Sequence, residues 1–155
     1  MSDDDSTAHG GPTVPRLLVI DDDVIQRTII AKIGAQAGYE TAGAASFAEA
    51  ERPLAKQCFD CATLDLSLGK ESGVVLLDKM VATNNRVPVI IISGAEGHIL
   101  SSTLKISESL GLDSQLLNKP LKLAELREAL LQKREGWVAR RGINRHYQLV
   151  GNGTA

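Results

Sequence analysis

The stretch Cys61-Ala62-Thr63-Leu64-Asp65-Leu66-Ser67-Leu68 decides the fold, because it joins a strand of buried character to one carboxylate. Apolar and β-prone residues lead up to Asp65, and a loop containing Gly69 and Gly73 follows it. Open α/β folds bind ligands just outside the carboxyl ends of their strands. We therefore expect Asp65 to be exposed at the rim of a sheet. Taken alone, however, it is most simply a helix-capping or loop residue, so its role depends on the rest of the chain.

Segments of strand character alternate with segments of helical character on both sides of this stretch. The expected strands are residues 16–20, 39–43, 60–64, 87–92 and 114–117. The expected helices cover about residues 25–37, 46–56, 72–83, 98–110 and 123–130, with Ile25, Ile29 and Ile33 marking the first and Leu123, Leu126 and Leu130 the last. Strict alternation of this kind predicts an α/β fold with a parallel sheet, helices on both faces and right-handed crossovers.

Local signals predict where several helices begin and end. Gly38 and Gly111 are expected just past two helix ends. Ser46 and Glu49 have the spacing of a capping box, which predicts a helix start. Pro53 lies inside that helix and should kink or shorten it.

Length and composition predict one domain with two short tails. We expect residues 1–15 to be a disordered acidic arm, residues 16–133 to be the domain, and residues 134–155 to be a basic and aromatic tail. The formal net charge of -2 argues against general nucleic-acid binding. No apolar run approaches the roughly 20 residues that span a bilayer, and no signal peptide is visible. A cytoplasmic protein without membrane contact is therefore expected.

Cys58 and Cys61 have C-x-x-C spacing. A redox pair should lie at a helix N-terminus, and a zinc site would need a second pair of ligands. Neither context is present in the sequence, so we expect two ordinary, partly buried thiols.

Polar residues lie at the ends of four of the predicted strands. Asp21 and Asp22 follow the first strand, whereas Asp65, Ser93 and Lys119 end the third, fourth and fifth. Parallel strands end at one edge of the sheet, so these side chains should meet there. Three neighbouring carboxylates repel one another and need a cation, and oxygen ligands suit Mg²⁺. A hydroxyl and an ammonium suit phosphoryl oxygens, which makes Asp65 a candidate nucleophile toward a phosphoryl donor.

With these residues, the chain resembles the receiver domain of the two-component response-regulator family over about residues 16–133, in the manner of the chemotaxis regulators. The resemblance implies a flavodoxin-like, doubly wound, five-stranded parallel sheet with strand order 2-1-3-4-5. It also implies that Asp22 and Asp65 bind Mg²⁺ directly, together with the backbone carbonyl of Ser67, and that Asp21 binds it through water.

The resemblance further implies that Asp65 accepts a phosphoryl group from a phosphohistidine on a sensor kinase or phosphotransfer protein. Ser93 and Lys119 would hold the phosphoryl oxygens, and the Lys119–Pro120 peptide bond would be cis. There are departures from the family's pattern. Gly69 stands where the family often has Pro, Gly94 stands where Ala is common, and Leu116 replaces the aromatic residue that many receivers use as a switch.

The expected function is that of a single-domain response regulator, not an enzyme, that changes its binding to a downstream protein when phosphorylated. A homodimer is one form that such binding could take, with the tail from 134 to 155 as the contact. The alternatives are the receiver input module of a longer effector, such as a cyclic-di-GMP phosphodiesterase, and a degenerate receiver that has lost phosphorylation.

Overall fold

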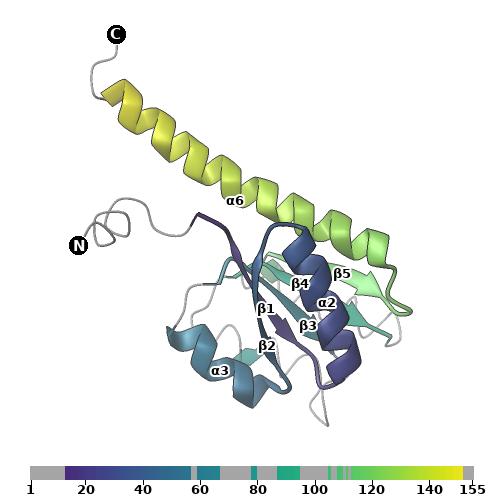
Figure 1. The fold of residues 1–155 in the computed structure, drawn as a ribbon. Coiled ribbons are helices and arrows are strands. Elements are labelled where there is room, and N and C mark those ends of the chain that lie inside the picture. Colours follow the sequence, from purple (N-terminus) through teal and green to yellow (C-terminus); the bar gives the residue numbers. More distant parts are fainter. Residues whose placement is uncertain are drawn as a thin grey trace, which may run out of the picture.

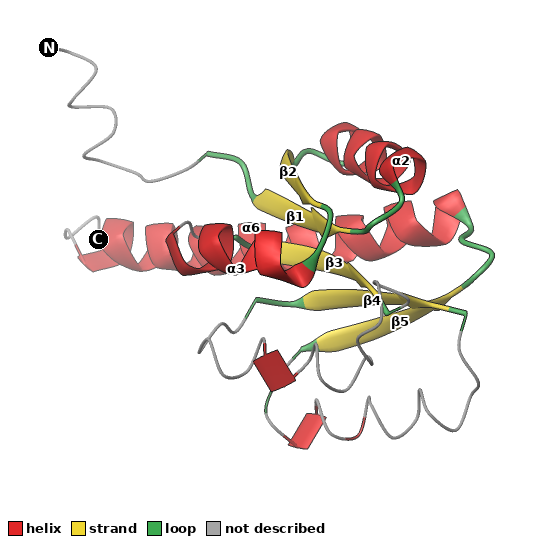
Figure 2. Cartoon of the chain, turned by 90° about the horizontal axis from the view of Figure 1, so that it is seen from below, coloured by secondary structure: helices red, strands yellow, loops and turns green. Residues whose placement is uncertain are grey.

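The computed structural model describes residues 13–56, 59–66, 78–79, 87–94, 105, 108–109, 111 and 113–151. Five strands form one parallel sheet in the order β2-β1-β3-β4-β5, which confirms the predicted topology. The strands are β1 (Arg16–Ile20), β2 (Glu40–Ala44), β3 (Cys61–Asp65), β4 (Val89–Ser93) and β5 (Ser114–Asn118). Figure 2 shows them side by side, from β2 at the top to β5 at the bottom.

Helices cover both faces of the sheet (Figure 1). Helix α2 (Val24–Gln36) and helix α6 (Leu123–Gly151) share one apolar cluster with Leu17 and Val19 of β1. Helix α3 (Phe47–Lys56) packs on the opposite cluster, which contains Leu18 and Ile20. The alternation of sides along β1 is the period-2 pattern of a strand buried on both faces. The doubly wound arrangement is therefore as predicted.

Strand β1 has its predicted range, and the other four strands differ from theirs by one or two residues. Strand β3 lies one residue later than the range 60–64 and ends on Asp65, the residue predicted to end it. Asp60, the first residue of the predicted range, precedes the strand and accepts a 2.8 Å hydrogen bond from the backbone N–H of Arg16. Strand β4 begins only after Pro88, which cannot donate to a ladder.

Helix α2 does not present the apolar stripe that the sequence suggested. Ile25 and Ile29 are 69% and 40% exposed, whereas Ile30 and Ile33 are buried. The i, i+4, i+8 spacing of Ile25, Ile29 and Ile33 drifts around a helix of 3.6 residues per turn, so only its last member reaches the sheet. Ile30 takes the core position instead.

The capping predictions hold. The backbone N–H of Glu49 donates to Ser46 Oγ at 3.1 Å, and Glu49 Oε1 accepts from the N–H of Ala45 at 3.1 Å. Pro53 lies inside α3, yet the helix continues to its predicted end at Lys56. Gly38 follows α2 with φ +96°, and Gly111 has φ +77°.

Helix α6 runs without a break from Leu123 to Gly151, through the change in composition at Lys133 (Figure 1). Leu126 and Leu130 are fully buried, while Leu123 is 47% exposed in the first turn. The Tyr39 hydroxyl donates to the Leu130 carbonyl oxygen at 2.6 Å, and burial raises the pKa of Tyr39, which keeps this donor protonated. Further along α6, Lys133 pairs with Asp113 at 2.9 Å.

The far part of α6 carries a buried aromatic residue. Trp137 is only 9% exposed, and the Arg141 guanidinium carbon lies 4.8 Å from its ring centre. Segment 134–151 is therefore helical, and Trp137 within it is covered.

Several predictions fall outside the described residues. They concern Ser67, Gly69, the helix predicted over residues 72–83, most of the helix predicted over 98–110, and most of the acidic arm. Cys58 also lies outside them, whereas Cys61 is a fully buried thiol whose pKa burial raises to about 12, as suits a structural residue. Among the described residues, no helix is both long enough and apolar enough to cross a bilayer.

Gly38→Ala should lower the free energy of unfolding by roughly 1–3 kcal/mol, because a Cβ strains a positive φ. A Cβ placed there would also lie 2.5 Å from Arg134 Nε. The matched control is Gly136→Ala inside α6, where the nearest atom is Arg140 Nη1 at 3.5 Å. This change should stabilise the protein by up to about 1 kcal/mol. Urea unfolding followed by circular dichroism measures the free energy of unfolding of both variants. Equal effects of the two substitutions would contradict the need for glycine at position 38.

Candidate functional site

The predicted site residues gather at the carboxyl edge of the sheet. Asp21 directly follows β1, Asp65 ends β3, Ser93 ends β4 and Lys119 follows β5. The strand register aligns them, since Asp65 pairs with Ile92 and Ser93 with Asn118. The structure therefore brings together every predicted site residue that it describes.

Three carboxylates form the centre of the site. Asp21, Asp22 and Asp65 each offer an oxygen atom within 4.8 Å of the other two. Asp21 and Asp65 are 0% and 2% exposed, whereas Asp22 is exposed. The expectation that Asp65 would be exposed at the rim is therefore wrong: the side chains of Lys119 and Gln26 contact its carboxylate and help to enclose it.

Burial raises the pKa of Asp21, and the charge of Asp65 raises it further. Hydrogen bonds from the Asp23 backbone and the Gln26 side chain act in the opposite direction, as does the charge of Lys119. The net upward shift means that the fold holds the ionised Asp21 at a cost. A bound cation would remove that cost, because it favours the charged form.

Lys119 supplies the positive charge of the site. Its ammonium lies 3.1 Å from Asp65 Oδ1 and 2.9 Å from Oδ2. The Lys119–Pro120 bond is cis, as predicted, and the Lys119 N–H donates to the Ser93 carbonyl oxygen at 2.9 Å. The ammonium therefore contacts both oxygens of Asp65 and lies where it could neutralise an oxygen of a transferred group.

The run Asp21-Asp22-Asp23 has three distinct roles. Asp21 accepts a 2.9 Å hydrogen bond from the Asp23 N–H, which turns the chain after β1. Asp22 remains exposed beside the buried pair. Asp23 is exposed and caps α2 by accepting from the N–H of Ile25 at 2.9 Å.

The donor set fits a hard divalent cation. All three residues of the cluster offer carboxylate oxygens, which are the ligands that Mg²⁺ prefers. The fourth expected ligand, the carbonyl of Ser67, lies outside the described residues.

Gln26 is a further residue of the site, and no sequence pattern had predicted it there. Its amide nitrogen donates to Asp65 Oδ2 at 3.1 Å and also to Asp21 Oδ2. The available signal was its position three residues after the N-cap Asp23, since helical side chains lean back toward the N-terminus. A side chain there lies over the end of β1 and next to the carboxylates.

A cavity of about 340 Å³ adjoins the site. It lies between the start of α2 and the segment after β5, and its lining includes Gln26, Lys119 and the partly exposed apolar residues Ile25, Ile29 and Leu123. This groove therefore places apolar surface next to the ammonium that holds Asp65.

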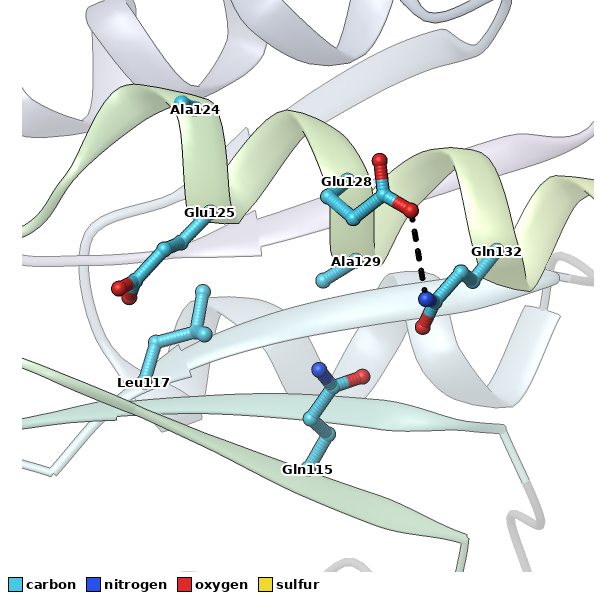
Figure 3. A pocket seen from close by; sticks show the side chains of 7 residues that line it. All are labelled: Gln115, Leu117, Ala124, Glu125, Glu128, Ala129 and Gln132. Carbon is cyan, nitrogen blue, oxygen red and sulfur yellow. Dashed lines mark hydrogen bonds between the residues drawn. The ribbon is translucent and has the colours of Figure 1, made fainter.

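A second cavity of about 380 Å³ lies between β5 and α6 (Figure 3). Gln115 and Leu117 point toward it from the strand, opposite Glu125 and Glu128 of the helix. Gln132 donates to Glu128 at 3.4 Å. Its lining contains none of the predicted site residues, so the acidic cluster remains the candidate site.

Comparison with curated proteins finds several regulatory relatives. The chain is 35% identical over 95 residues to regulatory protein VirG of Agrobacterium fabrum (strain C58 / ATCC 33970), which covers 61% of this chain and 37% of VirG. It is 33% identical over 131 residues to transcriptional regulatory protein PrrA of Mycobacterium tuberculosis (strain ATCC 25618 / H37Rv), covering 83% and 54% of the two chains.

A third relative is a protein-glutamate methylesterase/protein-glutamine glutaminase of Nocardioides sp. (strain ATCC BAA-499 / JS614), 29% identical over 141 residues that cover 84% of this chain and 38% of that protein. The chain thus spans between about a third and just over half of these relatives. Because their names include a transcriptional regulator and an enzyme, the expectations of no DNA binding and no enzymatic activity are not supported for a longer protein.

The fold has solved counterparts. The receiver domain protein (CheY-like) of Methanospirillum hungatei JF-1 matches with a TM-score of 0.70 at 23% identity, over 83% of this chain and 99% of that one. The model of the response regulator receiver domain matches residues 17–131, which include every predicted site residue. On the strength of that match, the chain belongs to the response regulator receiver domain family.

Proposed function

We propose that the chain accepts a phosphoryl group on Asp65 from a phosphohistidine of a sensor kinase or phosphotransfer protein, in a reaction that requires Mg²⁺. The observation that carries this proposal is the buried Asp65 carboxylate, held between the Lys119 ammonium at 2.9 Å and the carboxylates of Asp21 and Asp22. A nucleophile beside a cation and a second positive charge is the arrangement that phosphoryl transfer needs.

In the proposed transfer, an oxygen of Asp65 forms a bond to phosphorus while the bond from phosphorus to the donor's imidazole nitrogen breaks. The electron pair of that bond leaves with the imidazole, which yields an acyl phosphate on Asp65. Lys119 neutralises a phosphoryl oxygen, and the hydroxyl of Ser93, at the end of the neighbouring strand, donates to another. Asp22 and Asp65 would hold Mg²⁺ directly and Asp21 would hold it through water, and the ion would supply further charge neutralisation.

The groove beside the site is the proposed docking surface for the phosphodonor protein. The donor must bring its phosphohistidine to Asp65, and the groove shares Lys119 with the site. Ile25 is 69% exposed and Leu123 is 47% exposed there, so a protein surface can bury both. The groove thus offers apolar contact immediately next to the reacting carboxylate.

The output of phosphorylation is proposed to be a change in binding to a partner protein, with a homodimer through α6 as one form. Leu116, in place of an aromatic residue, is partly buried against the apolar cluster that contains Leu64 and Ile91. An aromatic switch at that position is therefore not part of the mechanism proposed here. The signal would pass to a separate downstream protein if the chain is a single-domain regulator. In a longer protein it would pass to an effector domain, such as a cyclic-di-GMP phosphodiesterase.

Asp65→Asn should abolish phosphorylation by acetyl phosphate in the presence of Mg²⁺, because an amide is not a nucleophile toward phosphorus at neutral pH. Intact-protein mass spectrometry should show one added phosphoryl group on the wild type and none on the variant. The matched control is Asp23→Asn, an exposed neighbour that keeps its capping ability. Uptake of phosphate by Asp65→Asn would overturn the assignment of the acceptor.

Asp21→Asn should raise the free energy of unfolding of the metal-free protein at pH 7 by roughly 1 kcal/mol, because it removes a buried charge. The sign follows from the raised pKa of Asp21. The ionised carboxyl destabilises the fold above that pKa, and the cost disappears as the pH falls through it. Urea unfolding in the presence of a chelator should therefore show a higher free energy of unfolding for Asp21→Asn than for the wild type at pH 7. This difference should shrink as the pH is lowered. A less stable variant at pH 7 would contradict this reading.

Ile25→Ser should weaken binding of the phosphodonor protein roughly tenfold or more, because exposed apolar anchors dominate such interfaces. Phosphorylation by acetyl phosphate, which needs no protein surface, should be unchanged. The control is Val138→Ser, which removes a 43% exposed apolar side chain of α6 that does not line the groove. The kinetics of phosphotransfer from the donor protein measure binding to both variants. Equal losses of donor affinity for the two variants would argue against this docking surface.

A further inference from the structure

Gln26 occupies the space between two of the proposed metal ligands. It is the third residue of α2, and its amide nitrogen is within hydrogen-bond distance of both Asp65 Oδ2, at 3.1 Å, and Asp21 Oδ2. The nitrogen must be the atom that faces the carboxylates, because the amide oxygen cannot donate and would be repelled by them. A neutral donor thus links two buried carboxylates that repel each other.

A cation at these carboxylates would compete with this amide for oxygen atoms. Mg²⁺ approaches its ligand oxygens to about 2.0–2.1 Å and demands near-octahedral geometry. An ion that takes Asp65 Oδ2 or lies against Asp21 Oδ2 would meet the Gln26 nitrogen, which contacts both of these atoms. The side chain has to withdraw, or turn its amide oxygen toward a metal-bound water, before the ion can settle.

We propose that Gln26 is an internal placeholder for the cation, which holds Asp21 and Asp65 together in the metal-free protein and thereby lowers the affinity for Mg²⁺. This inference rests on the Mg²⁺ site proposed above. It adds that a residue of α2, rather than the acidic cluster alone, sets the metal affinity.

The placeholder also connects the metal site to the groove. Gln26 lines that groove together with its neighbour Ile25 and with Lys119. Because metal binding displaces its amide, the lining of the groove changes when the ion binds. The surface offered to the phosphodonor therefore depends on whether the site holds Mg²⁺.

The test is a titration with Mg²⁺, followed by NMR chemical shifts, of the wild type and of Gln26→Met, which keeps the length of the side chain and removes the donor. The variant should bind Mg²⁺ roughly tenfold more tightly, since a hydrogen bond to a charged group is lost from the metal-free state alone. Gln36→Met, at the exposed end of α2, is the matched control and should leave the affinity unchanged.

A second measurement separates a placeholder from a merely structural residue. In a chelator, Gln26→Met should lower the midpoint of urea unfolding relative to the wild type. In saturating Mg²⁺, the two midpoints should coincide, because the ion has already displaced the amide. A loss of stability in both conditions would overturn the proposal. Gln26→Leu repeats the test with a different apolar side chain, should Gln26→Met fold poorly.

The outcomes distinguish a failure of the placeholder proposal from a failure of the proposed Mg²⁺ site. A wild type that shows no shifts at the strand ends with Mg²⁺ refutes the metal site itself and the placeholder with it. A wild type that binds, beside a Gln26→Met variant of equal or lower affinity, refutes the placeholder alone and leaves the metal site standing.

Discussion

The mutual repulsion of the carboxylates at the sheet edge is the constraint on which the rest of this structure depends. Asp21 and Asp65 are both buried, and with Asp22 their oxygens lie within 4.8 Å of one another. The strand order creates this proximity, because β1 pairs directly with β3. Three groups offset the repulsion: the Lys119 ammonium, the Asp23 N–H and the Gln26 amide. Asp23 and Gln26 lie together at the start of α2, whereas Lys119 follows β5, so the site forms only when β1 and β5 are both in place in the sheet.

The apolar sheet supplies the stability that the site lacks. All five residues of β3 and of β4 are buried, and their apolar side chains belong to the two clusters on opposite faces of the sheet. Asp65 and Ser93 end these two strands, so two residues of the proposed site are attached to fully buried strands. Such placement suits a site whose groups must keep their geometry while charge changes. The burial of β3 and β4 also explains how the fold tolerates three mutually repelling carboxylates at the ends of its strands.

Sequence reasoning found the features that depend on neighbours along the chain. The β/α alternation, the capping box at Ser46 and the Gly38 helix end are local, and the meeting of the strand ends follows from parallel pairing. It missed features that depend on packing. The exposure of Ile25 depends on which side of α2 meets the sheet, and the burial of Asp65 depends on side chains from α2 and the segment after β5. Gln26 escaped notice because a glutamine in a helix is ordinary until its position over β1 is known.

Helix α6 could transmit a conformational change at the acidic cluster to residues distant from it. Only three residues separate Lys119 from Leu123, where α6 begins, so the movement of Lys119 that the proposed phosphorylation implies would be transmitted to the start of that helix. Leu126 and Leu130 fix the start of α6 in the core, and the Tyr39 hydroxyl holds the Leu130 carbonyl at 2.6 Å. A displacement of these anchored first turns would tilt the helix as one body. In a chain with Leu116 where receivers often carry an aromatic switch, such a tilt would carry the phosphorylation signal to the segment from Lys133 to Gly151.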